Sequence, residues 1–172
     1  PLERAQLESN EARAAVAALD TAEGSETPQL AQALGRLGYF SWQRGDHATA
    51  EKLYARQLRY IEKNFGPDAE ATAHALLNLG AQLTPQGRFA EAKLVYDRAI
   101  RIREALGKTQ DEAFAHCLNN LAFVHQSECE YERARTLFER ALGIFEKTYG
   151  PDDPKTATSL NNLAALLELQ GK

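Results

Sequence analysis

The stretch LLNLGAQLTPQGRFAEAKLVYDRAI (residues 76–100) decides the fold class, because it returns 42 residues later as LNNLAFVHQSECEYERARTLFERAL (residues 118–142). The same offset aligns the rest of the chain on itself. The columns that it produces include Leu34, Leu76, Leu118 and Leu160; Leu37, Leu79, Leu121 and Leu163; Ala31, Ala73, Ala115 and Ala157; and Ala50, Ala92 and Ala134. A fixed period of this length predicts a repeat architecture.

Each repeat unit is predicted to hold two helices. Its apolar residues recur three and four positions apart, as in Leu76, Leu79 and Leu83, which is the spacing of one helix face. We expect the first helix of a unit to end at a glycine, such as Gly87, and the second to end before a Gly-Pro pair, as at residues 150–151. A lone helix pair cannot bury its apolar stripe, so stacking of the units is predicted.

Three positions depart from the repeat pattern. Cys129 stands where other units have the turn glycine, and a positive φ there would cost about 1 kcal/mol relative to Gly. Pro85 falls in the last turn of a first helix, which should therefore kink or end early. Gly107 comes one place early and has no proline after it, so we expect residues 107–112 to form the least regular connection.

The alternation of small and large residues resembles the tetratricopeptide repeat. This pattern is Leu-Gly or Leu-Ala in the first helix, and Ala followed four places later by an aromatic residue in the second. The segments EAKLVYDRAIRIREALG (residues 91–107) and TYGPDDPKTATSLNNLAALLELQGK (residues 148–172) are similar to the kinesin-light-chain type of this repeat. The resemblance implies an all-α fold, a right-handed superhelix (α-α solenoid) of antiparallel helix pairs with about eight helices.

The register divides the chain into one array of repeats. Residues 1–28 are expected to supply the second helix of a preceding half-repeat, and residues 155–172 the first helix of a truncated fourth repeat. The three full repeats are expected at residues 29–70, 71–112 and 113–154. We expect Leu163, Leu166 and Leu167 to lack part of their cover, which would leave an apolar patch for self-association at the C-terminal repeat end.

Composition narrows the class of partner. The chain has 172 residues, of which 26% are charged and 44% hydrophobic, with a net charge of −4. These values exclude a disordered chain and a disulfide-stapled miniprotein, and the interspersed charges offer no basic field for nucleic acid or an anionic membrane. No apolar run approaches the roughly 18 residues that a membrane-spanning helix needs. We therefore expect neither nucleic acid nor a membrane as a partner.

Two further features concern the setting of the chain. The sequence starts at Pro1 and contains no Met, so we expect a piece of a longer protein. Cys117 and Cys129 lie at opposite ends of one predicted helix, too far apart to bridge each other. Unpaired thiols favour a reducing compartment, which predicts a cytoplasmic location.

The family resemblance also implies a binding surface. In such arrays the first helices line a concave groove, and the asparagine before each Leu-Gly or Leu-Ala pair resembles a column that holds an extended peptide. That column comprises Asn78, Asn120 and Asn162, with Arg36 in its place in the first full repeat. An amide offers a donor and an acceptor together and can bind a peptide backbone of any sequence, whereas Arg36 would suit a carboxylate. The alternative is that these asparagines are structural and bond neighbouring helices or loops.

Other residues of the first helices share the expected groove. They are Tyr39, Trp42, His74, His116, Asn119, Phe123 and Asn161. Aromatic side chains combine apolar area with, in Tyr and Trp, a polar group, and they often dominate peptide recognition. For Tyr39, Trp42 and Phe123 the alternative is burial between repeats as part of the core.

Metal, cofactor and catalytic sites are not expected from the sequence. His74 and His116 are one repeat apart, and equivalent residues of adjacent repeats lie about 10 Å apart, too far to share one metal ion. His125 falls in a column with Leu83 and Leu167, which indicates a packing role. There is no catalytic triad motif, phosphate loop, CxxC or HExxH.

These features predict a non-catalytic protein-protein interaction module, an adaptor or scaffold that binds a peptide segment of a partner in its groove. Two alternatives stay open. The chain could be a self-association or structural assembly module that works through its repeat ends, or a regulatory domain of a larger multidomain protein.

Overall fold

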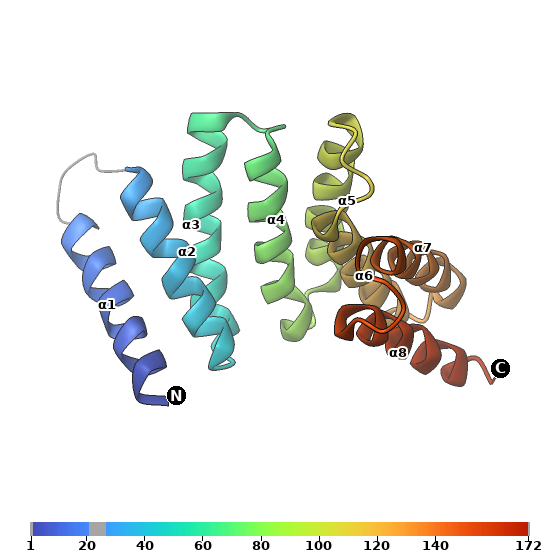
Figure 1. Ribbon diagram of the computed structural model, residues 1–172. Coiled ribbons are helices and arrows are strands. Elements are labelled where there is room, and N and C mark those ends of the chain that lie inside the picture. Colours follow the sequence, from blue (N-terminus) through green and yellow to red (C-terminus); the bar gives the residue numbers. More distant parts are fainter. Residues whose placement is uncertain (1, 21–26, 172) are drawn as a thin grey trace. The chain divides into compact units, whose positions relative to one another are not determined.

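The computed structural model describes residues 2–20 and 27–171, and within these ranges it contains helices and no strand (Figure 1). The α-helices are α1 (Leu2–Asp20), α2 (Pro28–Gln43), α3 (His47–Phe65), α4 (Glu70–Leu83), α5 (Phe89–Ala105), α6 (Glu112–Ser127), α7 (Tyr131–Tyr149) and α8 (Pro154–Leu169), and a short 3-10 helix, η1 (Thr84–Gln86), follows α4. The expectation of an all-α fold with about eight helices is confirmed. Among the described residues, none of the helices has the length and apolar character needed to cross a bilayer.

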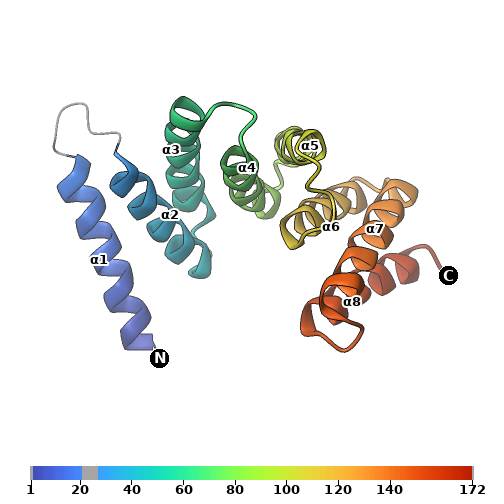
Figure 2. The same cartoon turned by 45° about the horizontal axis from the view of Figure 1, so that its top comes forward.

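The helices form two compact units, Pro1–Gln86 and Gly87–Lys172. In the first unit α1, α2, α3 and α4 pack in chain order, each against the next. In the second unit α5 packs on α6, α6 on α7 and α7 on α8. Figure 2 shows that successive helices within each unit run in opposite directions, which is the up-and-down arrangement of stacked helix pairs.

Side-chain caps fix where four of the helices begin. Thr27, Asp46 and Asp111 each accept a hydrogen bond from the backbone N–H three residues later, at the starts of α2, α3 and α6. Asp153 accepts one from the N–H of Lys155 at the start of α8, over 2.8 Å. Such caps satisfy N–H groups that have no partner inside the helix.

The turns inside the helix pairs share one backbone conformation. Gly45, Gly87 and Gly171 have φ values of 74°, 72° and 69°, and Cys129 has a φ of 61° at the equivalent place. A Cβ added at Gly45 or Gly87 would meet nothing within 4 Å, so the turn favours glycine for its backbone conformation and not for lack of space. The expectation of a positive φ at Cys129 is confirmed. Both cysteines are unpaired, Cys117 buried and Cys129 exposed.

The remaining departures also behave as expected. Helix α4 stops at Leu83, and the chain continues through the 3-10 turn that contains Pro85. The connections after α3 and α7 are alike, since Thr72 Oγ1 donates to the carbonyl of Gly66 and Thr156 Oγ1 to that of Gly150. The connection after α5 lacks this bond, because Phe114 stands at the position of the two threonines.

A buried arginine holds that irregular connection. Arg103 of α5 is only 3% exposed, and its Nη2 lies 2.5 Å from Oδ2 of Asp111, the cap of α6. Its Nε has no hydrogen-bond partner. The N–H of Lys108 donates to the carbonyl of Arg103 over 2.8 Å and closes the end of α5. The positive charge of Arg103 is thus compensated by the carboxylate of Asp111.

Small residues let the helices approach. In α2 a Cβ at Gly38 would lie 3.0 Å from the ring of Tyr54 in α3, so any larger residue would have to push this ring aside. In the second unit, Ala122, Ala134, Phe138 and Leu166 form one buried cluster where α6, α7 and α8 meet. A second cluster consists of Phe114, Ala115, Leu118, Ala141, Ile144 and Phe145.

The expected apolar patch on the last helix is only partly correct. Leu166 is fully buried, because it points into the cluster with Phe138, and Leu163 and Leu167 are half-buried. The exposed large side chains of α8 are instead Leu160 and Leu169, at 52% and 59%. The leucines that α8 exposes most are therefore not the ones predicted.

Candidate functional site

The expected binding residues form stripes along the first helices of the repeats. On α6, His116, Asn119, Asn120 and Phe123 follow one another at three- and four-residue spacing and so share one side of the helix. The first three are half-buried, and Phe123 is 50% exposed. The core alternative for Phe123 is therefore wrong.

A pocket of about 180 Å³ lies beside this stripe in the second unit. Its lining residues are His116, Asn119, Phe145, Lys155, Thr158 and Ser159. Two of the six, His116 and Asn119, were predicted from the sequence. Thr158 was missed, although it occupies the column of His74 and His116. Nothing in the sequence pattern pointed to Lys155, Ser159 or Phe145.

Two of the predicted asparagines bond each other. Nδ2 of Asn162 on α8 donates to Oδ1 of Asn119 on α6 over 3.2 Å. This bond supports the structural alternative for Asn162. In contrast, no side-chain hydrogen bond of Asn78 or Asn120 is found within the described part of the chain, so their donors and acceptors stay available. The asparagine column thus combines one structural amide with two unbonded ones.

Charges at the edge of the pocket are paired. Glu112 lies 2.7 Å from Nζ of Lys155, accepts a hydrogen bond from the hydroxyl of Tyr149, and lies 3.2 Å from Nε2 of His116. The hydrogen bond from Lys155, followed by that from Tyr149, lowers the pKa of Glu112 to about 2. The hydrogen bonds of Lys155 to Glu112 and, second, to Tyr149 raise the pKa of Lys155. The ammonium of Lys155 is therefore already compensated by Glu112.

One buried hydroxyl beside the pocket lacks a partner. Oγ of Ser159 is buried and makes no hydrogen bond in the structure. Leaving a buried polar group unpaired costs about 1–3 kcal/mol. The ring of Phe145 forms the apolar part of the lining, 5.3 Å from the ring of His116. The pocket thus offers polar groups next to one aromatic ring.

In the first unit the expected aromatic residues lie on the surface of α2. Tyr39 and Trp42 are 47% and 44% exposed, and their ring centroids lie 5.6 Å apart. Nε2 of Gln43 donates to the hydroxyl of Tyr39 over 2.8 Å. The core alternative is wrong for both aromatic residues. Arg36, one turn before Tyr39 on the same helix, is exposed.

The predicted binding residues are divided between the two units. The first holds Arg36, Tyr39, Trp42, His74 and Asn78, and the second holds His116, Asn119, Asn120, Phe123, Asn161 and Asn162. His74 and Asn161 are exposed. The structure brings Asn119 together with Asn162, and His116 with Asn119 at the pocket.

Comparison with known proteins identifies the repeat. A family model described as "Tetratricopeptide repeat" matches residues 29–105 and 114–172. The chain belongs to the tetratricopeptide repeat family. Among curated proteins no significant match was found.

Solved structures share the tetratricopeptide fold. BtubC (BKLC) from P. vanneervenii is 22% identical with a TM-score of 0.80, over 98% of this chain and 67% of that one. A kinesin light chain of Podosopora anserina, described there as putative and as having nearly identical TPR-like repeats, is 18% identical with a TM-score of 0.77, over 98% of this chain and 80% of that one. The resemblance to kinesin-light-chain repeats is confirmed at the level of the fold.

One group of side chains in this tetratricopeptide chain could bind a metal ion. His125 is buried, as its repeat column predicts, but its Nδ1 also lies 2.5 Å from Oε2 of Glu130. With Glu128 these two residues form the one group of three potential ligands found among the described residues. The sequence analysis missed the group, because it considered His125 only as a packing residue.

Proposed function

We propose that this chain is a non-catalytic interaction module that binds a peptide segment of a partner protein along the first helices of its repeats. Tetratricopeptide repeats are generally protein-protein interaction modules. The observation that carries the proposal is the pocket lined by His116 and Asn119, where an aromatic ring and polar groups meet. The same helix, α6, also carries the unbonded amide of Asn120.

The pocket suits one side chain of an extended peptide. Phe145 supplies an apolar contact, and Nδ2 of Asn119 and the hydroxyl of Ser159 can donate hydrogen bonds. A backbone segment passing over α6 would present N–H and C=O groups to Asn120, whose amide can bind both. This mode of binding is tolerant of sequence outside the pocket.

A second contact is proposed on α2 in the first unit. The Tyr39 and Trp42 rings are exposed side by side, and Arg36 lies close by in the helix sequence. Exposed aromatic residues with a polar group are enriched among residues that dominate binding energy. The same helix therefore offers a place for an aromatic or apolar side chain of the partner.

Selection from a random peptide library tests the proposal. Peptides selected on the wild type are measured by fluorescence polarisation against Asn119→Leu, Asn120→Ala and Trp42→Ala, with the exposed Lys147→Ala on α7 as the matched control. Circular dichroism first establishes that all variants are folded. We expect Asn119→Leu and Asn120→Ala to weaken binding by roughly tenfold or more, as loss of hot-spot contacts does. Equal affinity for every variant would contradict the proposed site.

Self-association through α8 is the second candidate. Leu160 and Leu169 are exposed large apolar side chains on this helix, and Ala164 and Ala165 between them are exposed too. Light scattering of the wild type over a range of concentrations, beside a Leu160→Lys, Leu169→Lys double variant, tests this function. A mass that rises with concentration only in the wild type supports it, and a constant monomer mass contradicts it.

The two unpaired thiols fit a reducing, cytoplasmic setting for either function.

A further inference from the structure

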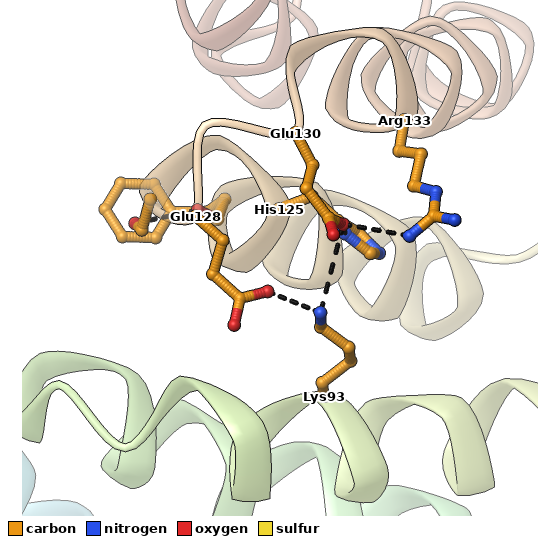
Figure 3. Close-up of polar contacts among 7 residues, drawn as sticks. Lys93, His125, Glu128, Glu130 and Arg133 are labelled. Carbon is orange, nitrogen blue, oxygen red and sulfur yellow. Dashed lines mark hydrogen bonds and ion pairs between the residues drawn. The ribbon is translucent and has the colours of Figure 1, made fainter.

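The turn between α6 and α7 gathers an imidazole and two carboxylates around one point (Figure 3). A ring nitrogen of His125 and carboxylate oxygens of Glu128 and Glu130 all lie within 4.8 Å of one another, and Nδ1 is the nitrogen that faces Glu130. His125 is in the last turn of α6, and the two glutamates follow it in the connection to α7. Three different ligand atoms are thus supplied by six consecutive residues.

A cation already occupies this cluster. Nζ of Lys93, from α5, forms an ion pair with Glu128 and lies 3.9 Å from Oε2 of Glu130. Nη1 of Arg133 lies 3.1 Å from the same oxygen of Glu130. Figure 3 shows the two carboxylates reaching the Lys93 ammonium, with the imidazole of His125 beside the carboxylate of Glu130. The ammonium marks the place where positive charge is stabilised.

The backbone holds the ligands before any ion binds. The N–H groups of Glu128 and Glu130 both donate to the carbonyl of His125, over 3.2 and 2.8 Å. Cys129 between them adopts the φ of 61° that closes the turn. The His125 ring is buried and so restricted in its rotation. The backbone of the turn and the His125 ring would therefore lose little conformational freedom on binding an ion.

The cluster is not a feature of the repeat. One unit earlier, Leu83, Gln86 and Arg88 stand at the positions of His125, Glu128 and Glu130. The equivalent of the Lys93–Glu128 pair is there a hydrogen bond from Nε2 of Gln86 to Oε2 of Glu51, 3.0 Å long. The contact between helix and turn thus does not require this set of residues. Packing alone does not account for a histidine and two glutamates here.

We propose that this turn binds a divalent transition-metal ion of the zinc class through His125 Nδ1, Glu128 and Glu130, with the Lys93 side chain displaced into solvent. Imidazole nitrogen and carboxylate oxygen are both zinc ligands, and a set of three protein ligands leaves a coordination position for water. The imidazole favours zinc and its neighbours in the transition series over Mg²⁺ and Ca²⁺, which prefer oxygen ligands alone.

The displacement of Lys93 is compatible with its surroundings. Its side chain is partly exposed, and the flexible stem of lysine lets the ammonium leave the cluster without moving the backbone. A divalent ion then replaces one positive charge by two between the carboxylates of Glu128 and Glu130. The sequence argument against a metal concerned His74 and His116, neither of which belongs to this set.

Calorimetric titration of the whole chain tests the proposal. After treatment with EDTA and its removal, the wild type is titrated with ZnCl₂ and, separately, with MgCl₂. We expect one Zn²⁺ per chain and no heat of binding from Mg²⁺. His125→Gln, Glu128→Gln and Glu130→Gln should each weaken Zn²⁺ binding on the order of ten- to a hundredfold or more, since even outer partners of metal ligands carry that much. His47→Gln, in the first unit, is the matched control and should bind as the wild type does.

A fifth variant separates a metal site from a simple ion-pair network. Lys93→Gln removes the competing ammonium and should tighten Zn²⁺ binding by up to about fivefold, the worth of a surface ion pair. Circular dichroism of each variant establishes that it is folded, and the exposed Glu128 keeps the test available if His125→Gln unfolds. No Zn²⁺ binding by the wild type, equal binding by Glu128→Gln, or weaker binding by Lys93→Gln would overturn the proposal.

Discussion

The amide of Asn162 on α8 donates a hydrogen bond to the side-chain carbonyl of Asn119 on α6 over 3.2 Å. The two residues come from successive repeats and couple the stacked helices of the second unit. A double-mutant cycle of Asn119→Ala and Asn162→Ala, followed by urea unfolding, should give a coupling energy of about 0.5–1.5 kcal/mol. Simple additivity of the two substitutions would show that the bond contributes nothing to stability.

Cys129→Gly should raise the melting temperature. A residue with a Cβ costs about 1 kcal/mol in the left-handed region that Cys129 occupies at a φ of 61°, and glycine removes this strain while adding some freedom to the unfolded chain. Differential scanning calorimetry measures the change. The reverse substitution, Gly45→Ala, should lower the melting temperature, since nothing but the backbone opposes it. A lower melting temperature for Cys129→Gly would refute the strain argument.

Substitution of Asp111 should lower the free energy of unfolding more than substitution of its partner Arg103. Asp111→Ala takes away the cap of α6 and leaves a nearly buried guanidinium without its carboxylate, for a loss of about 3 kcal/mol. Arg103→Met keeps the cap and fills the same volume, so its stability should stay within about 1.5 kcal/mol of the wild type. Guanidinium unfolding compares the two. A greater loss for Arg103→Met would contradict the asymmetry.

The Glu112 carboxylate predicts a stability difference that depends on pH. Its pKa is about 2 in the folded chain, below the ordinary 4.5, because Lys155 and Tyr149 bond its charged form. The group therefore stabilises the fold fully above about pH 4.5, and this contribution is lost as the pH falls toward 2. Thermal unfolding of wild type and Glu112→Gln from pH 7 to pH 2 should show a wild-type advantage that shrinks over that interval. A gap independent of pH would contradict the assignment.

The periodic part of the structure follows from the sequence. The helix spacing predicts the helices, and the glycine column predicts the turns, including the strained one at Cys129. Pro85, whose ring and missing N–H oppose continuation of a helix, follows the end of α4 at Leu83. These features depend on residues close together in the chain, whose local conformation the sequence determines directly.

The side-chain contacts between helices could be predicted less well from the sequence. Whether Asn162 meets Asn119 depends on how α8 rotates and slides on α6, which a repeat register does not specify. The same rotation buries Leu166 and exposes Leu160, contrary to the expected patch. The set of His125, Glu128 and Glu130 was missed for a different reason. Aligning the repeats draws attention to residues that are alike at equivalent positions, whereas these three differ from their counterparts in the other repeats.

The shared conformation of the turns at Gly45, Gly87 and Cys129 separates the path of the chain from the chemistry that it carries. One backbone geometry tolerates an open glycine at two of these turns and a cysteine flanked by two glutamates at the third. Residues beside such a turn can therefore be exchanged with little change to the helices that it joins. Each turn thus keeps a constant backbone conformation while its side chains vary independently. New chemistry can therefore be acquired one turn at a time.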